Sequence, residues 1–257
     1  YLVEGLKKEA LIDKIMITTN GSLLTKAKLV SLKKSGLDSV TISLDASSQK
    51  VGNIMNPVNN NHVLVSEAID NVISIFNSVK VNMVVIKGIN DIEIIPMLEK
   101  FLDKNVELRF IEYMDVGETN GWNLDDVIPA RELISQIDAK YPVEPISPNY
   151  QGEVAKRWRF RDDQGEIGFI TSVTESFCGD CSRARLSAVG KIYTCLFATE
   201  GHDLRMLLRS GASDSDLLES ITNIWQTRSD RYSELRGMNA PMPDSGKVKV
   251  EMSHIGG

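Results

Sequence analysis

Apolar residues follow two different periods in the first part of the chain, and the two periods alternate. Runs rich in β-branched residues predict strands over residues 15–21, 39–45, 79–90 and 106–114. Helical spacing between them predicts one helix capped by Thr25 and ended by Gly36, one from Val65 to Phe76, and one over 92–104. Alternating strands and helices predict an α/β fold of parallel β/α units, as an open doubly wound sheet or as a closed or partial barrel.

The pattern changes after Met114. A polar segment leads to a short helix over residues 131–139, two strands at 157–161 and 167–173, and an amphipathic helix over 213–227. The sequence therefore predicts one β/α region followed by an appended α+β region.

Composition excludes some partners. The chain has 257 residues, 42% of them hydrophobic, and a net charge of −6. Nucleic-acid binders usually carry a basic excess, so a DNA or RNA partner is not expected, although a local basic pocket for a small anion is compatible with the charge. We expect no membrane association, because no apolar run is long enough for a spanning helix, and no signal-peptide pattern opens the chain. The first residue is Tyr1, which suggests a chain that begins inside a larger protein.

All three cysteines lie close together, as Cys178, Cys181 and Cys195. A redox CxxC pair would leave Cys195 without a role. A structural zinc site needs a fourth ligand, for which His202 is the nearest histidine. An iron–sulfur cluster normally takes four cysteines, so three would leave one iron open to another ligand. The spacing favours a zinc site and an iron–sulfur site about equally. An odd number of cysteines, clustered in one segment, suggests a cytoplasmic metal or redox site.

Arginines adjoin this segment. Arg183 and Arg185 point the same way in an extended chain, and paired guanidinium groups suit phosphate or carboxylate. Arg157, Arg159 and Arg161 alternate similarly, but we interpret them as a solvated strand face.

Several segments form a combination far more specific than a CxxC pair. They are ITTNG, TISLDA, VKVNMVV, KGIND, RFIEYMDVG, GEVAKRW, IGFITSVTESF, FCGDCSRARLSAVGKIYTCLF, RYSELR and the terminal HIGG. In these segments, which span essentially the whole chain, the sequence resembles the GTP 3′,8-cyclase family, radical S-adenosylmethionine lyases of molybdenum cofactor (molybdopterin) biosynthesis. The resemblance implies a partial (β/α)6 barrel of TIM type over residues 1–120, with the first two β/α units missing, and an α+β iron–sulfur domain over residues 121–257.

The resemblance also implies the chemistry. In the family, a 4Fe–4S cluster held by an N-terminal CxxxCxxC motif binds and cleaves S-adenosylmethionine. The resulting radical takes hydrogen from C3′ of GTP, and C3′ then joins C8, which gives (8S)-3′,8-cyclo-7,8-dihydroguanosine 5′-triphosphate. A second 4Fe–4S cluster binds the purine through its open iron. By resemblance its ligands are Cys178, Cys181 and Cys195, and the catalytic Arg183 and Arg185, with Ala184 between them, surround GTP.

Further roles follow from the same resemblance. Thr19 matches a GTP contact, Lys80 and Arg109 match residues that receive the triphosphate, and Ser43 and Met114 match S-adenosylmethionine contacts. The ordinary alternatives are a turn-capping threonine, a surface lysine, an arginine paired with a carboxylate, a solvated serine and a core methionine. The tail Gly256–Gly257 matches one that reaches toward the active site.

One departure from the family pattern is large. The 257 residues contain no CxxxCxxC motif and no Gly-Gly-Glu-Pro-like segment. We therefore expect an N-terminally truncated chain that is inactive alone, or a natural paralogue without the first cluster. The other hypotheses are another radical S-adenosylmethionine enzyme with an auxiliary cluster, or a non-catalytic zinc-stabilised binding module. The expected partners are GTP, S-adenosylmethionine, a second copy in a homodimer, and the downstream cyclic pyranopterin monophosphate synthase.

Overall fold

The computed structural model describes residues 1–10, 12–57, 62–162, 165–176, 178–237 and 246–255. They form two compact units. The first contains Tyr1–Tyr113 and Asp125–Thr171, and the second contains Met114–Leu124 and Ser172–Gly257. In the described ranges, no helix is both long and apolar enough to cross a bilayer.

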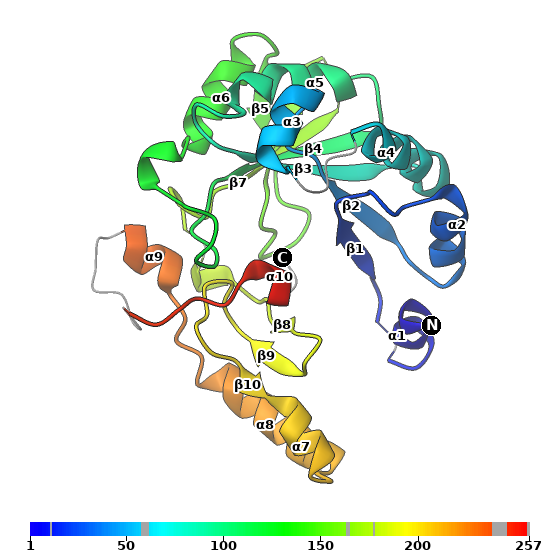
Figure 1. The fold of residues 1–257 in the computed structure, drawn as a ribbon, viewed down its shortest axis with the longest axis vertical. Helices are drawn as coiled ribbons and strands as arrows, with labels where there is room; N and C mark the ends of the chain where they lie inside the picture. The colour runs from blue at the N-terminus through cyan, green and yellow to red at the C-terminus, as the bar shows by residue number, and fades with distance from the viewer. Residues whose placement is uncertain (11, 58–61, 163–164, 177, 238–245, 256–257) are drawn as a thin grey trace. The chain divides into compact units, whose positions relative to one another are not determined.

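A seven-stranded sheet forms the centre of the first unit, as far as the described residues show (Figure 1). Its strand order is β1-β2-β3-β4-β7-β6-β5. The strands are β1 (Met16–Thr19), β2 (Ser39–Ser43), β3 (Val79–Val85), β4 (Val106–Glu112), β5 (Val143–Pro145), β6 (Lys156–Phe160) and β7 (Glu166–Ile170). Neighbouring strands from β1 to β4 are parallel, and β4 is also parallel to β7. The pairs β7–β6 and β6–β5 are antiparallel. The predicted α/β class is confirmed, and the largely parallel sheet with two edges suits a partial barrel.

Helices bury one face of this sheet. They are α1 (Leu2–Lys8), α2 (Lys26–Lys34), α3 (Gln49–Met55), α4 (His62–Phe76), α5 (Ile94–Phe101) and α6 (Ala130–Asp138), with 3-10 turns at Asp91–Glu93 and Leu124–Asp126. Alternate residues of β3, among them Val81 and Met83, join the same core cluster as Val65 and Ile69 of α4. Because strand side chains alternate between faces, the remaining residues of β3 face the other side.

Local signals that the sequence carries define two of these helices. The hydroxyl of Thr25 accepts a hydrogen bond from the N–H of Lys28, so Thr25 caps α2 as predicted. Gly36 follows α2 with a positive φ of 101°, which a glycine adopts without strain. Ser48 caps α3, and the buried carboxylate of Glu93 accepts hydrogen bonds from both Ser47 and Ser48.

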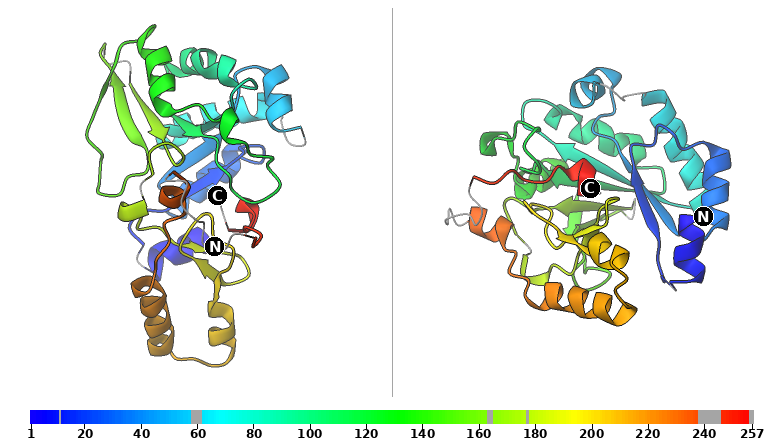
Figure 2. Two further views of the ribbon diagram at one scale, coloured as in Figure 1. Left: turned by 90° about the vertical axis from the view of Figure 1, so that its left-hand side faces the viewer. Right: turned by 60° about the horizontal axis from the view of Figure 1, so that its bottom comes forward.

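The second unit holds a small antiparallel sheet and short helices. In its described part the strand order is β10-β9-β8, made of β8 (Arg185–Leu186), β9 (Lys191–Tyr193) and β10 (His202–Asp203). The helices are α7 (Leu204–Arg209), α8 (Asp214–Gln226), α9 (Tyr232–Gly237) and α10 (Met252–Ile255), with a 3-10 turn at Cys178–Asp180. Figure 2 shows α7 and α8 side by side as a helical hairpin, and Ser213 and Asp216 start α8 with a reciprocal capping box.

Candidate functional site

Polar side chains form two rows on the face of the seven-stranded sheet that lies opposite the helices. Strand register defines a first polar row of Thr18, Thr41, Lys80 and Glu107. A second polar row, closer to the carboxyl ends of the strands, consists of Ser43, Asn82 and Arg109, and Gly168 on β7 is the register partner of Arg109. Active sites of parallel β/α barrels lie at the carboxyl ends of their strands. These rows are therefore the candidate site of the first unit.

Two cations in these rows share one carboxylate. Nζ of Lys80 lies 3.7 Å from Oε2 of Glu107, and Nε of Arg109 lies 2.5 Å from Oε1 of Glu107. Burial lowers the pKa of Lys80, and the positive charge of Arg109 lowers it further, whereas the negative charge of Glu107 raises it. A Cβ on Gly168 would lie 3.1 Å from Cγ of Arg109, so this glycine leaves room for the arginine. Lys14 and Glu153 also act on Lys80, in opposite directions, so the cations still outnumber the carboxylates by one and leave a positive face that suits an anion.

The strand-end residues differ in their positions. Ser43 is exposed at the end of β2, opposite Asn82. Thr19 ends β1 opposite the buried Ile42, so Thr18 and not Thr19 belongs to the polar rows. The hydroxyl of Thr19 accepts a hydrogen bond from the N–H of Gly21 at 3.2 Å. The role of Thr19 in nucleotide binding stays a prediction.

A hydrogen-bonded junction fixes the ends of β2 and β3. The side-chain amide of the fully buried Asn90 donates to the carbonyls of Asp45 and Val84, at 2.8 and 2.7 Å, and accepts from the N–H of Ile86 at 2.7 Å. Oδ1 of Asp45 accepts from the N–H of Val84 at 2.9 Å. These bonds join the TISLDA and KGIND segments and hold Ser43 in position beside β3.

The three cysteines of the second unit are partly buried free thiols, within the described residues. Burial raises the pKa of Cys181, but hydrogen bonds from Arg183 and Arg228 outweigh burial and bring this pKa to about 7. Burial raises the pKa of Cys195 to about 11, against a hydrogen bond from the N–H of Phe197. Arg185 interacts electrostatically with both Cys181 and Cys195.

The three thiols are possible ligands of a metal ion or an iron–sulfur cluster. No three His, Cys, Asp or Glu side chains are arranged to hold a metal ion in the described ranges. The donor chemistry nevertheless fits an iron–sulfur cluster, because thiolates are its usual ligands and guanidinium groups offset their charge. His202, the zinc ligand considered above, is exposed on β10.

Arg183 and Arg185 are half-buried, whereas Ala184 between them is exposed. The two arginines therefore point to one side, as an extended segment requires. Met114 is half-buried in the second unit, where its carbonyl accepts a hydrogen bond from the side chain of Asn120 at 2.8 Å. Gly256 and Gly257 lie outside the described residues.

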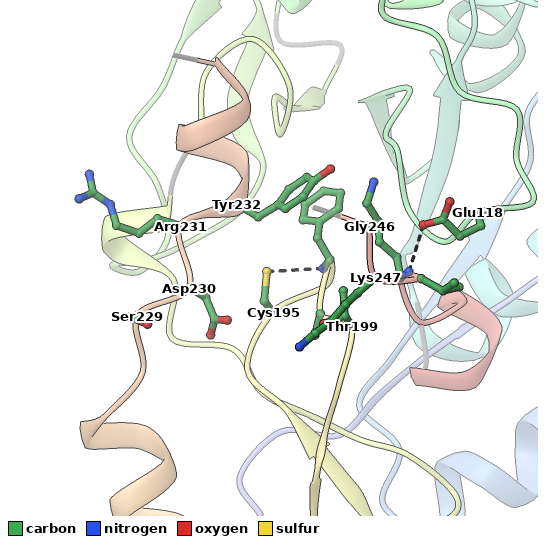
Figure 3. A pocket seen from close by; sticks show the side chains of 13 residues that line it. Glu118, Cys195, Thr199, Ser229, Asp230, Arg231, Tyr232, Gly246 and Lys247 are labelled. Carbon is green, nitrogen blue, oxygen red and sulfur yellow. Dashed lines mark hydrogen bonds between the residues drawn. The ribbon is translucent and has the colours of Figure 1, made fainter. Parts of the chain in front are cut away.

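A cleft of about 570 Å³ opens beside Cys195 (Figure 3). This volume is typical of small-molecule sites. The rings of Phe197 and Tyr232 stack in it at a centroid distance of 4.5 Å. Its charged lining consists of Glu118, Asp230, Arg231, Lys247 and Lys249.

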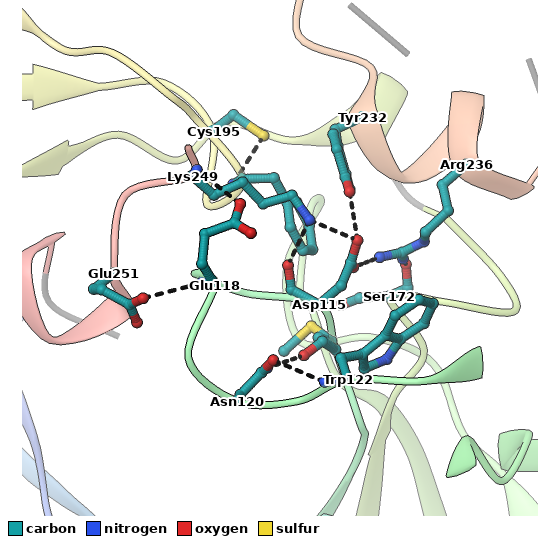
Figure 4. Close-up of polar contacts among 12 residues, drawn as sticks. Asp115, Glu118, Asn120, Trp122, Ser172, Cys195, Tyr232, Arg236, Lys249 and Glu251 are labelled. Carbon is teal, nitrogen blue, oxygen red and sulfur yellow. Dashed lines mark hydrogen bonds and ion pairs between the residues drawn. The ribbon is translucent and has the colours of Figure 1, made fainter. Parts of the chain in front are cut away.

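A charged network at this cleft was not predicted from the sequence. The buried carboxylate of Asp115 accepts hydrogen bonds from the hydroxyl of Tyr232, the guanidinium of Arg236 and, at 3.0 Å, Nζ of Lys249 (Figure 4). Arg236 also donates to the carbonyl of Ser172 at 2.6 Å. The network joins four separate parts of the chain, at Asp115, at Ser172, at Tyr232 and Arg236, and at Lys249.

Comparisons with known proteins now identify the class. Residues 1–101 match the family model for the radical SAM superfamily, and residues 106–234 match Molybdenum Cofactor Synthesis C. Together with the largely parallel sheet, these matches define a radical S-adenosylmethionine enzyme of molybdenum cofactor synthesis.

Curated relatives identify the family. A GTP 3′,8-cyclase of Staphylococcus epidermidis is 45% identical over 260 residues, which cover 100% of this chain and 75% of the relative. Those of Staphylococcus haemolyticus and Staphylococcus aureus are 43% and 44% identical over 247 residues, which cover 96% of this chain and 72% of each relative. The chain belongs to the GTP 3′,8-cyclase family, whose members are lyases.

Proposed function

We propose that this protein binds GTP and S-adenosylmethionine and converts GTP to (8S)-3′,8-cyclo-7,8-dihydroguanosine 5′-triphosphate, the first step of molybdenum cofactor synthesis. Family membership supports the reaction. The structural observation that carries it is the pair of cations, Lys80 and Arg109, on the polar face of the sheet. Their shared positive charge suits a triphosphate in a chain whose net charge is negative.

Residue roles belong to the same proposal. Lys80 and Arg109 bind the triphosphate, Thr19 contacts GTP, and Ser43 and Met114 contact S-adenosylmethionine. Iron–sulfur clusters and S-adenosylmethionine, when bound, supply one-electron and radical chemistry, and the chain supplies binding, orientation and charge.

The second unit supplies the cluster ligands in this proposal. Cys178, Cys181 and Cys195 hold a 4Fe–4S cluster, with one iron left for the purine. Arg183 and Arg185, which interact with these thiols, also surround GTP. The division into a barrel over residues 1–120 and a cluster-binding domain over residues 121–257 stays a prediction; Asp125–Thr171 belong to the first compact unit.

GTP binding by the 257-residue chain tests the triphosphate site. Charge-assisted hydrogen bonds contribute about 1.5–3 kcal/mol, so Lys80→Ala or Arg109→Ala is expected to weaken GTP binding roughly 10- to 150-fold in calorimetry. Arg159→Ala is the matched control, because Arg159 is an exposed arginine of the same sheet, paired with Glu144. Equal GTP affinity of the Lys80 and Arg109 variants and the wild type would refute the assignment.

Metal content tests the cysteines independently. After anaerobic reconstitution we expect about four iron and four sulfide per chain, brown absorption, and a spectrum that changes on addition of GTP. Cys195→Ser should lose most of this iron. One zinc in a colourless protein would instead support the zinc-stabilised binding module.

Cyclisation itself requires the family's CxxxCxxC segment, which the 257 residues lack. The chain is therefore to be joined to that segment of the Staphylococcus epidermidis relative. In this fusion, Arg183→Ala and Arg185→Ala are expected to abolish cyclisation while the iron content stays unchanged. Wild-type turnover in either variant contradicts their role.

The partners beyond substrate and cofactor follow from the family assignment. We expect a homodimer, a cytoplasmic location that suits free thiols, and use of the product by a cyclic pyranopterin monophosphate synthase. Light scattering of the purified chain checks the homodimer.

A further inference from the structure

The side chain of Asn82 carries a buried oxygen whose hydrogen-bonding capacity is unused. Its Oδ1 is shielded from solvent and accepts no hydrogen bond from any residue in the described part of the chain. Buried polar atoms in folded proteins are almost always paired, so an unpaired one calls for an explanation. Asn90 provides the contrast, since both polar atoms of its buried amide are hydrogen-bonded.

The strand register of Asn82 shows which residues are its neighbours on this face of the sheet. In the second polar row Asn82 lies between Ser43 on β2 and Arg109 on β4. Lys80 precedes it by two residues on β3 and therefore lies on the same face of the sheet. Asn82 is thus the register partner of Arg109 and lies one position nearer than Lys80, on the same face, to the carboxyl end of β3.

The chemistry of a nucleotide narrows the choice of partner. Ionised phosphate oxygens are acceptors only, so they cannot pair with an amide oxygen. The donors of a nucleoside triphosphate that lie nearest to its phosphates are the ribose hydroxyls. If the amide turned its NH₂ group inward instead, that donor would lie beside Lys80 and Arg109, which are themselves donors and cationic. An inward oxygen is therefore the favoured orientation.

We propose that Oδ1 of Asn82 accepts a hydrogen bond from a ribose hydroxyl of the nucleotide whose triphosphate is bound by Lys80 and Arg109. This inference rests on the proposed function, because it takes the triphosphate site as given. Asn82 then orients the sugar, the part of GTP on which the proposed reaction begins, and distinguishes ribonucleotides from deoxyribonucleotides.

Matched nucleotides test the contact. Affinities of GTP, 2′-deoxyGTP and 3′-deoxyGTP are to be measured by calorimetry for the wild type, Asn82→Ala and Lys80→Ala. One neutral hydrogen bond corresponds to a factor of roughly five to ten in affinity. The wild type should prefer GTP over one of the deoxynucleotides by about this factor. Asn82→Ala should bind GTP more weakly by the same factor and should no longer prefer GTP over the deoxynucleotide. Lys80→Ala should bind all three nucleotides more weakly and should keep the preference for GTP.

Thermal unfolding without ligand gives a second reading. Asn82→Leu replaces the unpaired amide with an apolar group of similar size, so its melting temperature should equal or exceed that of the wild type. A clear drop would show that the amide serves the fold, and it would overturn the inference.

The outcomes separate this inference from the proposed function. If the wild type binds GTP and Lys80→Ala does not, but Asn82→Ala retains the preference for GTP, the ribose contact is wrong and the triphosphate site stands. If the wild type binds none of the three nucleotides, the proposed function fails at this face, and the contact fails with it.

Discussion

Replacement of Asp115 by alanine should destabilise the second unit strongly. Asp115 is only 9% exposed, and its carboxylate contacts Arg236 and Lys249, whose side chains are 12% and 19% exposed. The alanine variant removes the carboxylate that both cations contact, while the cations remain largely buried. Breaking a buried ion pair in this way lowers the free energy of unfolding by about 3–5 kcal/mol. For a chain of this length that corresponds to a fall in melting temperature of roughly 6–20 °C.

The size of this effect can be checked within the same unit. Urea unfolding followed by tryptophan fluorescence suits the measurement, because Arg236 lies 5.8 Å from the ring of Trp122. Asp115→Asn keeps an acceptor but loses the charge, so its effect should be smaller. Glu200→Ala is the control, because the side chains of Glu200 and its partner Lys247 are 79% and 52% exposed, and an exposed pair contributes only about 0.2–1 kcal/mol. If Asp115→Ala lowers the free energy of unfolding no more than Glu200→Ala does, the network does not stabilise the unit.

Two further predictions concern the first unit. Burial raises the pKa of Asp45 from 3.8 to about 6, although a hydrogen bond from the N–H of Val84 acts in the opposite direction. The folded protein therefore favours the protonated carboxyl group. This contribution to the free energy of unfolding is complete below pH 3.8 and is lost as the pH rises through 6. Asp45→Asn should therefore raise the free energy of unfolding above pH 7 by up to about 3 kcal/mol, and the gain should shrink toward pH 4. Urea unfolding at several pH values measures this gain, and a difference that does not change with pH would contradict the prediction. Gly168→Ala places a Cβ 3.1 Å from Arg109 and 3.3 Å from Cβ of Ala155, so it should weaken GTP binding in calorimetry. Gly5→Ala, whose Cβ meets nothing within 4 Å, should leave binding unchanged, and equal GTP affinity of both glycine variants would refute the crowding argument.

The sequence predicted the elements that have a long periodic pattern. The four predicted strands contain β1 to β4, and the helix predicted from Val65 to Phe76 lies within α4 (His62–Phe76). Elements that are too short to show a periodic pattern were not predicted. β8 and β10 have two residues each, and α7 has six, so neither alternation nor helical spacing can be recognised in them. The parallel pairing of β7 with β4 was also not predicted, because pairing depends on the path of the chain and not on the pattern within a strand.

The candidate site divides in the same way. Lys80 and Arg109 were predicted through motifs, and their role in binding stays a prediction; the structure adds that they share Glu107. Asn82 was missed because its only sequence signal is a polar residue within a strand, and strand register alone places it beside Arg109. The Asp115 network was missed because its members come from positions 115, 232, 236 and 249, and no motif spans such distances.

The two kinds of missed residue differ in what they imply. Asp115 has partners for its charge within the chain, so the fold alone accounts for it, and its loss should be seen first in stability. Asn82 has a buried oxygen without a partner in the described chain, so the fold alone does not account for it. A buried polar atom without a partner costs free energy in the empty protein, and a bound molecule that pairs with it offsets this cost. This asymmetry is why ligand affinity tests Asn82 and unfolding tests Asp115.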